Sequence, residues 1–320
     1  MKAVAVWEYG GAEKLQLVDL PAPHAGPGQM RVRVHAATVN PADFLLREGA
    51  IDAMLSGRLP PPYRPGMEAA GVVDEIGPNA VTDLHIGDRV MAIVIPIDPS
   101  GGAYAEYIVL DPRQVGRAPA GSTHAEAATL PMNGLTSRLA LDVLSLVADN
   151  WLAVTGATGA VGGYAVQLAK VDGLRVVADA APADEDLVRT LGADHVVARG
   201  PDLAGRIRAS VPDGVAAVVD AALLGSDVVP AIRPGGQLAV VRRVGDRGVV
   251  SSRQHSDVTV RDVWVPEYRY ARDKLDSLRL LAEEGKLSLR VAQEYPASHA
   301  AEAHRRFEAG GVRGRLILTF

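Results

Sequence analysis

Hydrophobic and polar positions alternate in short runs along the first 120 residues, and glycine and proline interrupt these runs. The pattern is carried by residues 2–7, 15–21, 30–39, 69–77, 88–94 and 103–110. Alternation with a period of two is typical of strands with one buried face, and frequent turn residues favour a barrel-like antiparallel arrangement. We therefore predict a domain of short strands and irregular loops over residues 1–120.

From about residue 121 the pattern changes to helical spacing, first over 124–144, and then to alternating strands and helices. Strands are predicted at 151–155, 174–179, 195–197, 215–220 and 236–241, and helices at 160–171, 184–191, 201–209 and 225–231. Regular alternation of this kind is typical of a doubly wound parallel sheet. The predicted fold class is therefore α/β, with this second domain over residues 121–260.

The alternation weakens after residue 260. A helix is predicted at 273–284, a strand at 291–295, a second helix at 299–308 and a terminal strand at 315–320. A chain of 320 residues is long enough for two hydrophobic cores. We expect residues 261–320 to return to the first domain and complete it.

Composition and charge exclude several functions. Hydrophobic residues make up 48% of the chain, and the formal net charge is −5. Basic residues are scattered, with Arg242, Arg243 and Arg247 as the densest group, so no nucleic-acid interface is expected. The N-terminus lacks the apolar core of a signal peptide, and no apolar run is long enough for a membrane span, so we expect a cytoplasmic protein without a membrane partner.

Metal and disulfide chemistry have little support in the sequence. The chain has no cysteine, which excludes disulfides, cysteine nucleophiles and thiolate metal sites. His299 and His304 lie five residues apart, whereas two ligands on one helix face lie four apart. No metal ion is expected.

A glycine-rich turn joins the strand at 151–155 to the helix at 160–171. Unpaired backbone amides and the helix dipole favour a pyrophosphate at such a helix start, and glycine lets the phosphate approach the backbone. The motif alone fits an ordinary tight turn equally well, but the strand before it and the helix after it favour a dinucleotide. The predicted cofactor-binding residues here are Gly156, Thr158, Gly159, Ala160, Val161 and Gly162.

Asp179 closes the next predicted strand. Its carboxylate could accept hydrogen bonds from the adenosine ribose hydroxyls, and it would repel a 2′-phosphate, which favours NADH over NADPH. The nearest cation by sequence is Arg175, which should point away because it begins the same strand. The alternative is a solvated aspartate in an acid-rich loop. Ala221 and Val241 end two further strands and are predicted to contact the nicotinamide end through their backbones.

Several segments together resemble the zinc-independent quinone oxidoreductase branch of the medium-chain dehydrogenases/reductases. They are VNPADFLLREG at 39–49, PGMEAAGVVDEIG at 65–77, GDRV at 87–90, GGAYAEY at 101–107, LPMNGLTS at 130–137, LGADHVV at 191–197, VVDA at 218–221, RPGGQLAVV at 233–241 and GVRGRLIL at 311–318. The resemblance implies a GroES-like barrel as catalytic domain, a Rossmann cofactor domain and an active-site cleft between them. It also implies hydride transfer from NAD(P)H to a quinone or an α,β-unsaturated carbonyl.

Zinc-dependent relatives hold a catalytic metal with cysteine, histidine or acidic residues. The matching positions here carry Asn40, Met67 and Met132, and only Glu68 beside them could bind zinc. One ligand cannot hold a catalytic zinc, which needs three protein ligands. The resemblance therefore implies chemistry without zinc.

The resemblance also implies the residues of the active site. Asn40 would contact the acceptor oxygen or the cofactor ribose; the alternative is a cap of the helix that follows, and the two roles could coexist. Asp43 would act in the same loop, or else it pairs with Arg47 four residues later. Tyr63 would serve as a proton donor or as a wall of the cleft, with ordinary packing as the alternative.

Other residues are expected at the nicotinamide. Thr136 and Asn133 would form a wall beside it, or else they make local loop and cap hydrogen bonds. Arg315 would lie near the cofactor, with a surface position on the terminal strand as the alternative. The loop 48–64 and the region 242–268 are expected to shape the pocket for a small-molecule quinone or enone.

The sequence also suggests an assembly and an alternative function. The apolar segments 237–241 and 257–265 could pair across a two-fold axis, so a homodimer is expected. A protein that binds NAD(P)H as a sensor or structural protein, with little catalysis, is the alternative function, because one fold serves many roles.

Overall fold

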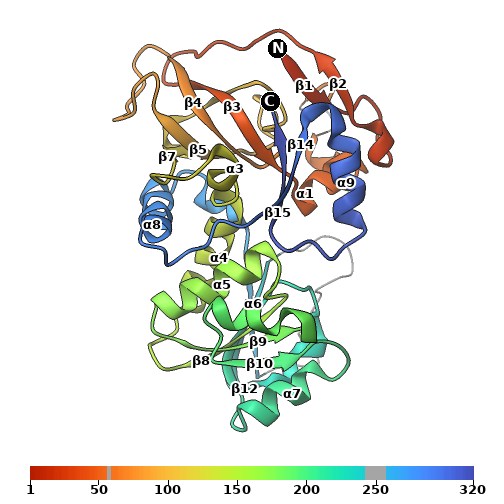
Figure 1. The fold of residues 1–320 in the computed structure, drawn as a ribbon, viewed down its shortest axis with the longest axis vertical. Coiled ribbons are helices and arrows are strands. Elements are labelled where there is room, and N and C mark those ends of the chain that lie inside the picture. The colour runs from red at the N-terminus through yellow and green to blue at the C-terminus, as the bar shows by residue number, and fades with distance from the viewer. Residues whose placement is uncertain (56–58, 242–256) are drawn as a thin grey trace. The chain divides into compact units, whose positions relative to one another are not determined.

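The computed structural model describes residues 1–55, 59–241 and 257–320. Contacts divide the chain into two compact units, drawn in Figure 1. The first unit comprises 1–132, 266–283 and 289–320, and the second comprises 133–265 and 284–288. The domain boundaries expected from the sequence, at 120 and 260, stay predictions. Parts of two segments that we expect to shape the pocket lie outside the described residues: 56–58 of the loop 48–64, and 242–256 of the region 242–268. The arginines at 242, 243 and 247 lie there too.

The first unit is built on one sheet of seven strands. Their order is β14-β15-β3-β4-β5-β7, and β6 also pairs with β3. The strands are β3 (Met30–Thr38), β4 (Glu68–Ile76), β5 (Arg89–Ile93), β6 (Tyr107–Leu110), β7 (Val115–Arg117), β14 (Val291–Pro296) and β15 (Arg315–Thr319). A separate antiparallel pair holds β1 (Lys2–Ala5) and β2 (Gln16–Asp19). All the strands predicted here are present, and only β7 was missed, since three residues are too short for a pattern.

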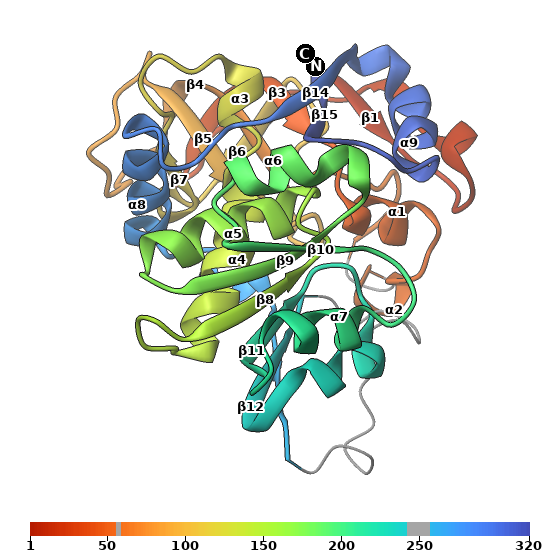
Figure 2. The ribbon, with the colours of Figure 1, turned by 60° about the horizontal axis from the view of Figure 1, so that its bottom comes forward.

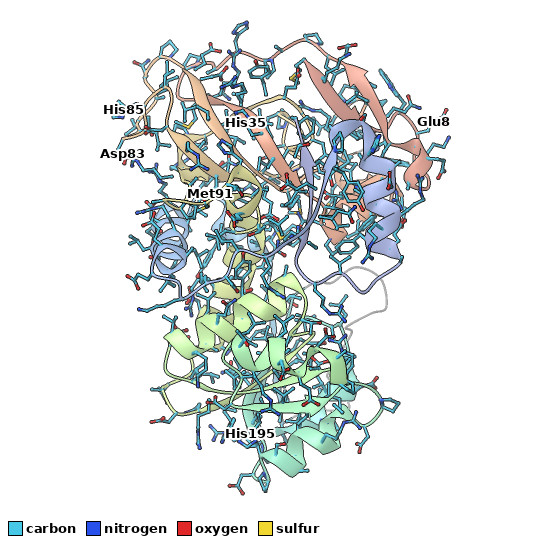
Figure 3. All side chains as sticks on the ribbon, viewed as in Figure 1. Glu8, His35, Asp83, His85, Met91 and His195 are labelled. Carbon is cyan, nitrogen blue, oxygen red and sulfur yellow. The ribbon has the colours of Figure 1, made fainter. Side chains whose placement is uncertain are left out.

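The C-terminal segment lies within the first unit. Strand β15 pairs antiparallel with β3, where Ile317 lies opposite Thr38. Helix α8 (Arg272–Glu283) is tied to the loop before β5, because Asp83 accepts hydrogen bonds from Arg117 and Arg272. These arginines lower the pKa of Asp83, labelled in Figure 3, to about 2. The chain therefore returns to the sheet with which it began.

The second unit is a parallel sheet in the order β10-β9-β8-β11-β12-β13. Its strands are β8 (Trp151–Thr155), β9 (Arg175–Ala180), β10 (His195–Ala198), β11 (Val215–Asp220), β12 (Ile232–Val240) and β13 (Thr259–Asp262). The chain runs outward from β8 to β10 and then crosses back to β11, which confirms the predicted doubly wound topology (Figure 2). All six residues of β11 are buried, as expected for a strand covered on both faces.

Helices connect the strands of both units. The α-helices are α1 (Pro41–Arg47), α2 (Asp52–Leu55), α3 (His124–Ala127), α4 (Pro131–Leu144), α5 (Ala160–Val171), α6 (Glu185–Thr190), α7 (Leu203–Ser210) and α9 (Ala300–Glu308), besides α8. Short 3-10 helices lie at η1 (Ala12–Lys14), η2 (Pro112–Gln114), η3 (Pro182–Asp184), η4 (Gly225–Ala231), η5 (Val265–Tyr268) and η6 (Ala297–His299). Within the described ranges, every helix is too short or too polar to cross a bilayer.

Three sequence predictions about elements are corrected. The single helix expected at 124–144 is two helices, because Pro131 has no N–H to continue the first and instead begins the second. The helix expected at 225–231 is a 3-10 helix that contains Pro230. Strand β12 begins at Ile232, before the expected 236, and pairs on one edge with β11 and on the other with β13. Segment 237–241 is therefore not free to pair with a second chain.

Backbone geometry at the glycine turn explains why two of its positions are occupied by glycine. Gly156 has φ +66°, in the left-handed region that favours glycine. A Cβ on Gly162 would lie 2.3 Å from the carbonyl oxygen of Gly156, closer than real contacts allow. The start of α5 can therefore pack on the turn only because residue 162 lacks a side chain.

This close contact predicts unequal effects of two alanine substitutions. Gly162→Ala forces the turn and α5 apart and should lower the free energy of unfolding by about 1–3 kcal/mol, the usual effect of overpacking. Gly159→Ala is the matched control, because its Cβ would lie 3.2 Å from the same oxygen. Urea denaturation of both variants measures the difference, and equal losses would contradict this packing.

Candidate functional site

Strands β8, β9 and β10 are neighbours in the sheet of the second unit (Figure 2). Polar groups gather where these strands end. One carboxylate oxygen of Asp179 accepts a hydrogen bond from the backbone amide of Ala157 at 3.3 Å, and the other accepts from Nε of Arg199 at 2.9 Å. Nη2 of Arg199 donates to the Thr158 hydroxyl at 3.1 Å. The predicted Asp179 and Thr158 therefore lie together, joined by an arginine that the sequence analysis missed.

Arg199 changes the interpretation of Asp179. The Asp179 side chain is 3% exposed, so the alternative of a solvated aspartate is wrong, while the Arg199 side chain is 41% exposed. Arg175 begins β9 and contacts the Asp149 carbonyl and the Trp151 ring, so it points away from Asp179 as predicted, and the cation in contact with Asp179 is Arg199. The available sequence signal was the position of Arg199, directly after the strand that neighbours β9.

The glycine turn has the features of a phosphate cradle. Gly159 is the N-cap of α5 and brings no side chain that could cap the helix. Ala160 and Val161 begin the helix and are half-buried. The backbone of Ala221 lies beside the turn, since a Cβ on Gly156 would be 3.3 Å from the Ala221 carbonyl carbon. Val241 comes directly after β12, at the same edge of the sheet. These residues fit the pyrophosphate and nicotinamide side of a dinucleotide.

A second polar cluster lies inside the first unit, and we call it the Glu68 network: Thr38, Asn40, Glu68 and Arg315. All four residues are at most 4% exposed. Nη2 of Arg315 donates to the Asn40 amide oxygen at 2.6 Å, to the Thr38 hydroxyl at 2.8 Å and to Glu68 at 3.1 Å. The Asn40 amide nitrogen donates to Thr38 at 2.9 Å and to Glu68 at 3.2 Å, and the Thr38 hydroxyl also donates to Glu68.

The Glu68 network leaves one alternative in place and corrects the other. Asn40 is the N-cap residue of α1 within a capping box, so capping coexists with the bonds of its side-chain amide in the network. In that box the backbone amide of Asn40 donates to the Asp43 carboxylate at 2.7 Å. Arg315 is not a surface cation, because it is buried against Glu68. A buried carboxylate needs such a partner, since an isolated charge in the interior is very costly.

The donor set here does not fit zinc. Besides its bonds within the network, the Glu68 carboxylate accepts the backbone amide of Met132 at 2.7 Å. The other positions that match zinc ligands carry the Asn40 amide and the thioethers of Met67 and Met132, which are poor zinc ligands. In the part of the chain that the structure describes, no three histidine or acidic side chains are grouped to hold a metal ion.

Asp43 belongs to a further buried set in the first unit, which we call the Asp43 chain: Asp43, Tyr104, His304 and Arg47. The Asp43 carboxylate accepts hydrogen bonds from the Gly66 amide at 2.8 Å and from the Tyr104 hydroxyl at 2.9 Å. The Tyr104 oxygen lies 3.2 Å from Nε2 of His304, and Arg47 lies 3.3 Å from Nδ1 of the same ring. Sequence reasoning missed Tyr104 and His304.

The expected pair between Asp43 and Arg47 is wrong. Among the described contacts, the carboxylate partners of Arg47 are Glu308, at 2.6 Å, and Glu48, at 2.5 Å. Burial raises the pKa of Asp43 to about 6, although its hydrogen bonds oppose this shift. Burial, helped by the charge of Arg47, lowers the pKa of His304 to about 3, so the ring stays neutral at pH 7.

The remaining predicted residues lie in ordinary packing environments. Tyr63 is half-buried, its ring stacks on Tyr9 with centroids 5.6 Å apart, and its backbone pairs with Val6. Asn133 and Thr136 lie on α4 and are 2% and 5% exposed. Their predicted roles at the substrate or the cofactor stay predictions.

Comparison with known proteins gives two family matches. Residues 26–120 match the alcohol dehydrogenase GroES-like domain, and residues 191–318 match the zinc-binding dehydrogenase family. A chloroplastic quinone oxidoreductase of Triphysaria versicolor is 35% identical over 204 residues. That match spans 62% of this chain and 60% of the relative, so the chain aligns with less than two thirds of that protein.

Several solved structures cover the whole chain, and two of them name a dinucleotide in their titles. An NAD-dependent alcohol dehydrogenase has a TM-score of 0.87 at 30% identity, with 100% of both chains covered. A mycobacterial protein in complex with NADPH has a TM-score of 0.86 at 26% identity, again with 100% of both chains covered. The two titles name different dinucleotides, so the fold alone does not determine which one this chain uses.

The Asp43 chain predicts a pH-dependent stability that His304→Gln should alter. The unfolded chain protonates His304 below its ordinary pKa of 6.5, whereas the folded protein protonates it only near pH 3. Stability is therefore lost as the pH falls through this window, by about 1.4 kcal/mol per pH unit. Asp43 acts in the opposite direction, because its folded pKa lies above its ordinary value of 3.8.

The test is therefore a difference between two proteins. The unfolding free energy of wild type minus that of His304→Gln should fall steadily between pH 6 and pH 4, as urea denaturation can measure. Asp43→Asn serves as the control of opposite sign. The unfolding free energy of wild type minus that of Asp43→Asn should rise as the pH falls from 6 to 4. A wild-type minus His304→Gln difference that stays constant with pH would contradict the buried neutral histidine.

Proposed function

The chain belongs to the quinone oxidoreductase branch of the medium-chain dehydrogenase/reductase superfamily, and from this premise we propose its reaction. We propose that it transfers hydride from a nicotinamide dinucleotide to a quinone or to the β-carbon of an α,β-unsaturated carbonyl. The dinucleotide supplies the hydride, and the protein binds and orients both reactants.

The observation that carries this proposal is the Glu68 network. At the positions where zinc relatives hold their metal, this chain has an amide and two thioethers, and Arg315 already compensates the charge of Glu68. Isolated ketones need strong polarisation of their oxygen, whereas a conjugated acceptor spreads the developing charge over several atoms. The donor set therefore favours conjugated acceptors.

The glycine turn supports the cofactor part of the proposal. Gly156, Gly159 and Gly162 form a bare backbone surface at the start of α5, and Ala221 and Val241 follow neighbouring strands at the same edge. We assign the pyrophosphate to the turn and the nicotinamide to the ends of β11 and β12. Thr136 on α4 is assigned to the nicotinamide wall.

We assign different roles to the predicted residues of the first unit. The Asn40 amide is held by Thr38, Glu68 and Arg315, and this fixed geometry suits a group that orients an acceptor or a ribose hydroxyl. Asp43 is 1% exposed and bonds to two backbone amides and to Tyr104, which suits a positioning residue for the Asn40 loop. Tyr63 is assigned to the wall of the pocket.

A homodimer remains part of the proposal. Strand β13 is the last strand in the order of the parallel sheet, and its pairing within the described residues is with β12. An exposed edge strand of this kind commonly pairs with another chain. We therefore keep the proposed two-fold contact at β13, which lies in the predicted segment 257–265, and no longer include segment 237–241.

Turnover with a matched set of acceptors tests the proposed function. The purified protein should oxidise NADPH or NADH with 1,4-benzoquinone or a short 2-alkenal, but not measurably with the corresponding saturated aldehyde. Treatment with a zinc chelator should leave the rate unchanged. Loss of the dinucleotide absorbance measures the rate.

Two outcomes would refute the proposal. Dinucleotide binding without turnover of any conjugated acceptor would favour the sensor function. Faster reaction with saturated carbonyls, lost on chelation and restored by zinc, would identify a zinc alcohol dehydrogenase instead.

A further inference from the structure

We propose that Arg199 determines which dinucleotide this chain prefers, by binding the 2′-phosphate of NADPH beside Asp179. The inference rests on the dinucleotide site of the proposed function, and it reverses the preference for NADH that Asp179 alone predicts. All the contacts that carry it lie within the second unit.

The strand register places Arg199 at the adenosine end of the site. In the parallel pair of β9 and β10, Val197 lies opposite Asp179 and Ala198 lies opposite Ala180. Arg199 is therefore the first residue beyond β10, at the edge of the sheet where β9 also ends. An acid at the end of this second strand is the usual ligand of the adenosine ribose, so a side chain bonded to it lies beside the ribose 2′ position.

The contacts of Arg199 orient its guanidinium toward the glycine turn. Nε bonds to Asp179 at 2.9 Å, and Nη2 bonds to the Thr158 hydroxyl at 3.1 Å. Its other terminal nitrogen has no hydrogen-bond partner within ranges 1–55, 59–241 and 257–320. A planar guanidinium held on one side can present its outer donors to a phosphate, which it binds through paired, charge-assisted hydrogen bonds.

Burial determines which charge an incoming nucleotide meets. Asp179 is 3% exposed, and its two oxygens accept hydrogen bonds from the Ala157 amide and from Arg199. Arg199 is 41% exposed, so the cation faces solvent and the compensated acid lies beneath it. A lone aspartate would repel a 2′-phosphate, whereas this pair presents positive charge to it.

Two of the acidic residues after β9 have partners of their own. Glu185 lies on α6 near Arg189, with a charge separation of 3.7 Å, so its charge is partly compensated. Asp184 is 8% exposed and also has a partner. Arg199 therefore remains the exposed charge in direct contact with Asp179.

Binding of two adenosine fragments tests the role of Arg199 without any acceptor. The fragments are 2′,5′-ADP, which carries the 2′-phosphate, and 5′-AMP, which lacks it. By calorimetry, wild type should bind 2′,5′-ADP about tenfold or more tightly than 5′-AMP. Arg199→Met should lose about tenfold or more in affinity for 2′,5′-ADP, as expected for lost hydrogen bonds to a charged group. Its affinity for 5′-AMP should change little.

Two further variants sharpen the test. Arg175→Met removes the same charge at the opposite end of β9 and should leave both affinities unchanged. Arg199→Lys keeps the charge but loses the planar fork, and should restore part of the affinity for 2′,5′-ADP. Thermal unfolding of each variant shows that the second unit is intact.

Three outcomes would overturn the inference, and a fourth would separate it from the proposed hydride transfer. Equal losses for both fragments in Arg199→Met would show that Arg199 only supports the loop. A wild type that prefers 5′-AMP would show that Asp179 decides. If wild type binds neither fragment, this inference and the dinucleotide site both fail. If the fragments bind as predicted but no acceptor is reduced, hydride transfer fails while the role of Arg199 stands.

Discussion

The pairing of one buried carboxylate, that of Glu68, with Arg315 is the interaction on which the first unit depends. Glu68 begins β4 and Arg315 begins β15, and both strands pair with β3, which ends at Thr38. The three strands thus bring the acid, the cation and the hydroxyl together. Since a buried acid without a partner would be costly, the register of β15 and the charge of Glu68 constrain each other. The fixed position of Asn40 follows from this pairing, because its amide bonds to all three groups.

The same principle operates at two further places, with different consequences. In the Asp43 chain, a tyrosine connects a carboxyl group to a neutral histidine, and the burial of both shifts their pKa values in opposite directions. In the second unit, Asp179 is buried but its partner Arg199 is exposed. The first arrangement holds a loop in place, whereas the second leaves a cation available to a ligand. In our proposal, the pair with both partners buried is structural, whereas the pair with one exposed partner recognises a ligand.

The sequence predicted local elements well, because their signals are local. Alternation located most strands of the two large sheets, and the spacing of Gly156, Gly159 and Gly162 located the turn. Contacts between residues far apart in the sequence could not be predicted in this way. Glu68 and Arg315 are 247 positions apart, and only the pairing of β15 with β3 brings them together. His304 was considered only as a metal ligand, because nothing nearby in sequence indicates that it meets Tyr104. Arg199 was missed because its partner lies on a neighbouring strand, 20 positions away.

We propose that the Glu68 network suits hydride delivery to a conjugated acceptor without a metal ion. The most direct measurement uses a dinucleotide carrying deuterium at C4 of the nicotinamide, a 2-alkenal as acceptor, and NMR of the product. The account predicts deuterium at the β-carbon of a saturated aldehyde. Deuterium at the carbonyl carbon of an unsaturated alcohol would contradict it, because that product requires direct polarisation of a carbonyl, and the described residues group no ligands for a metal ion that could supply it.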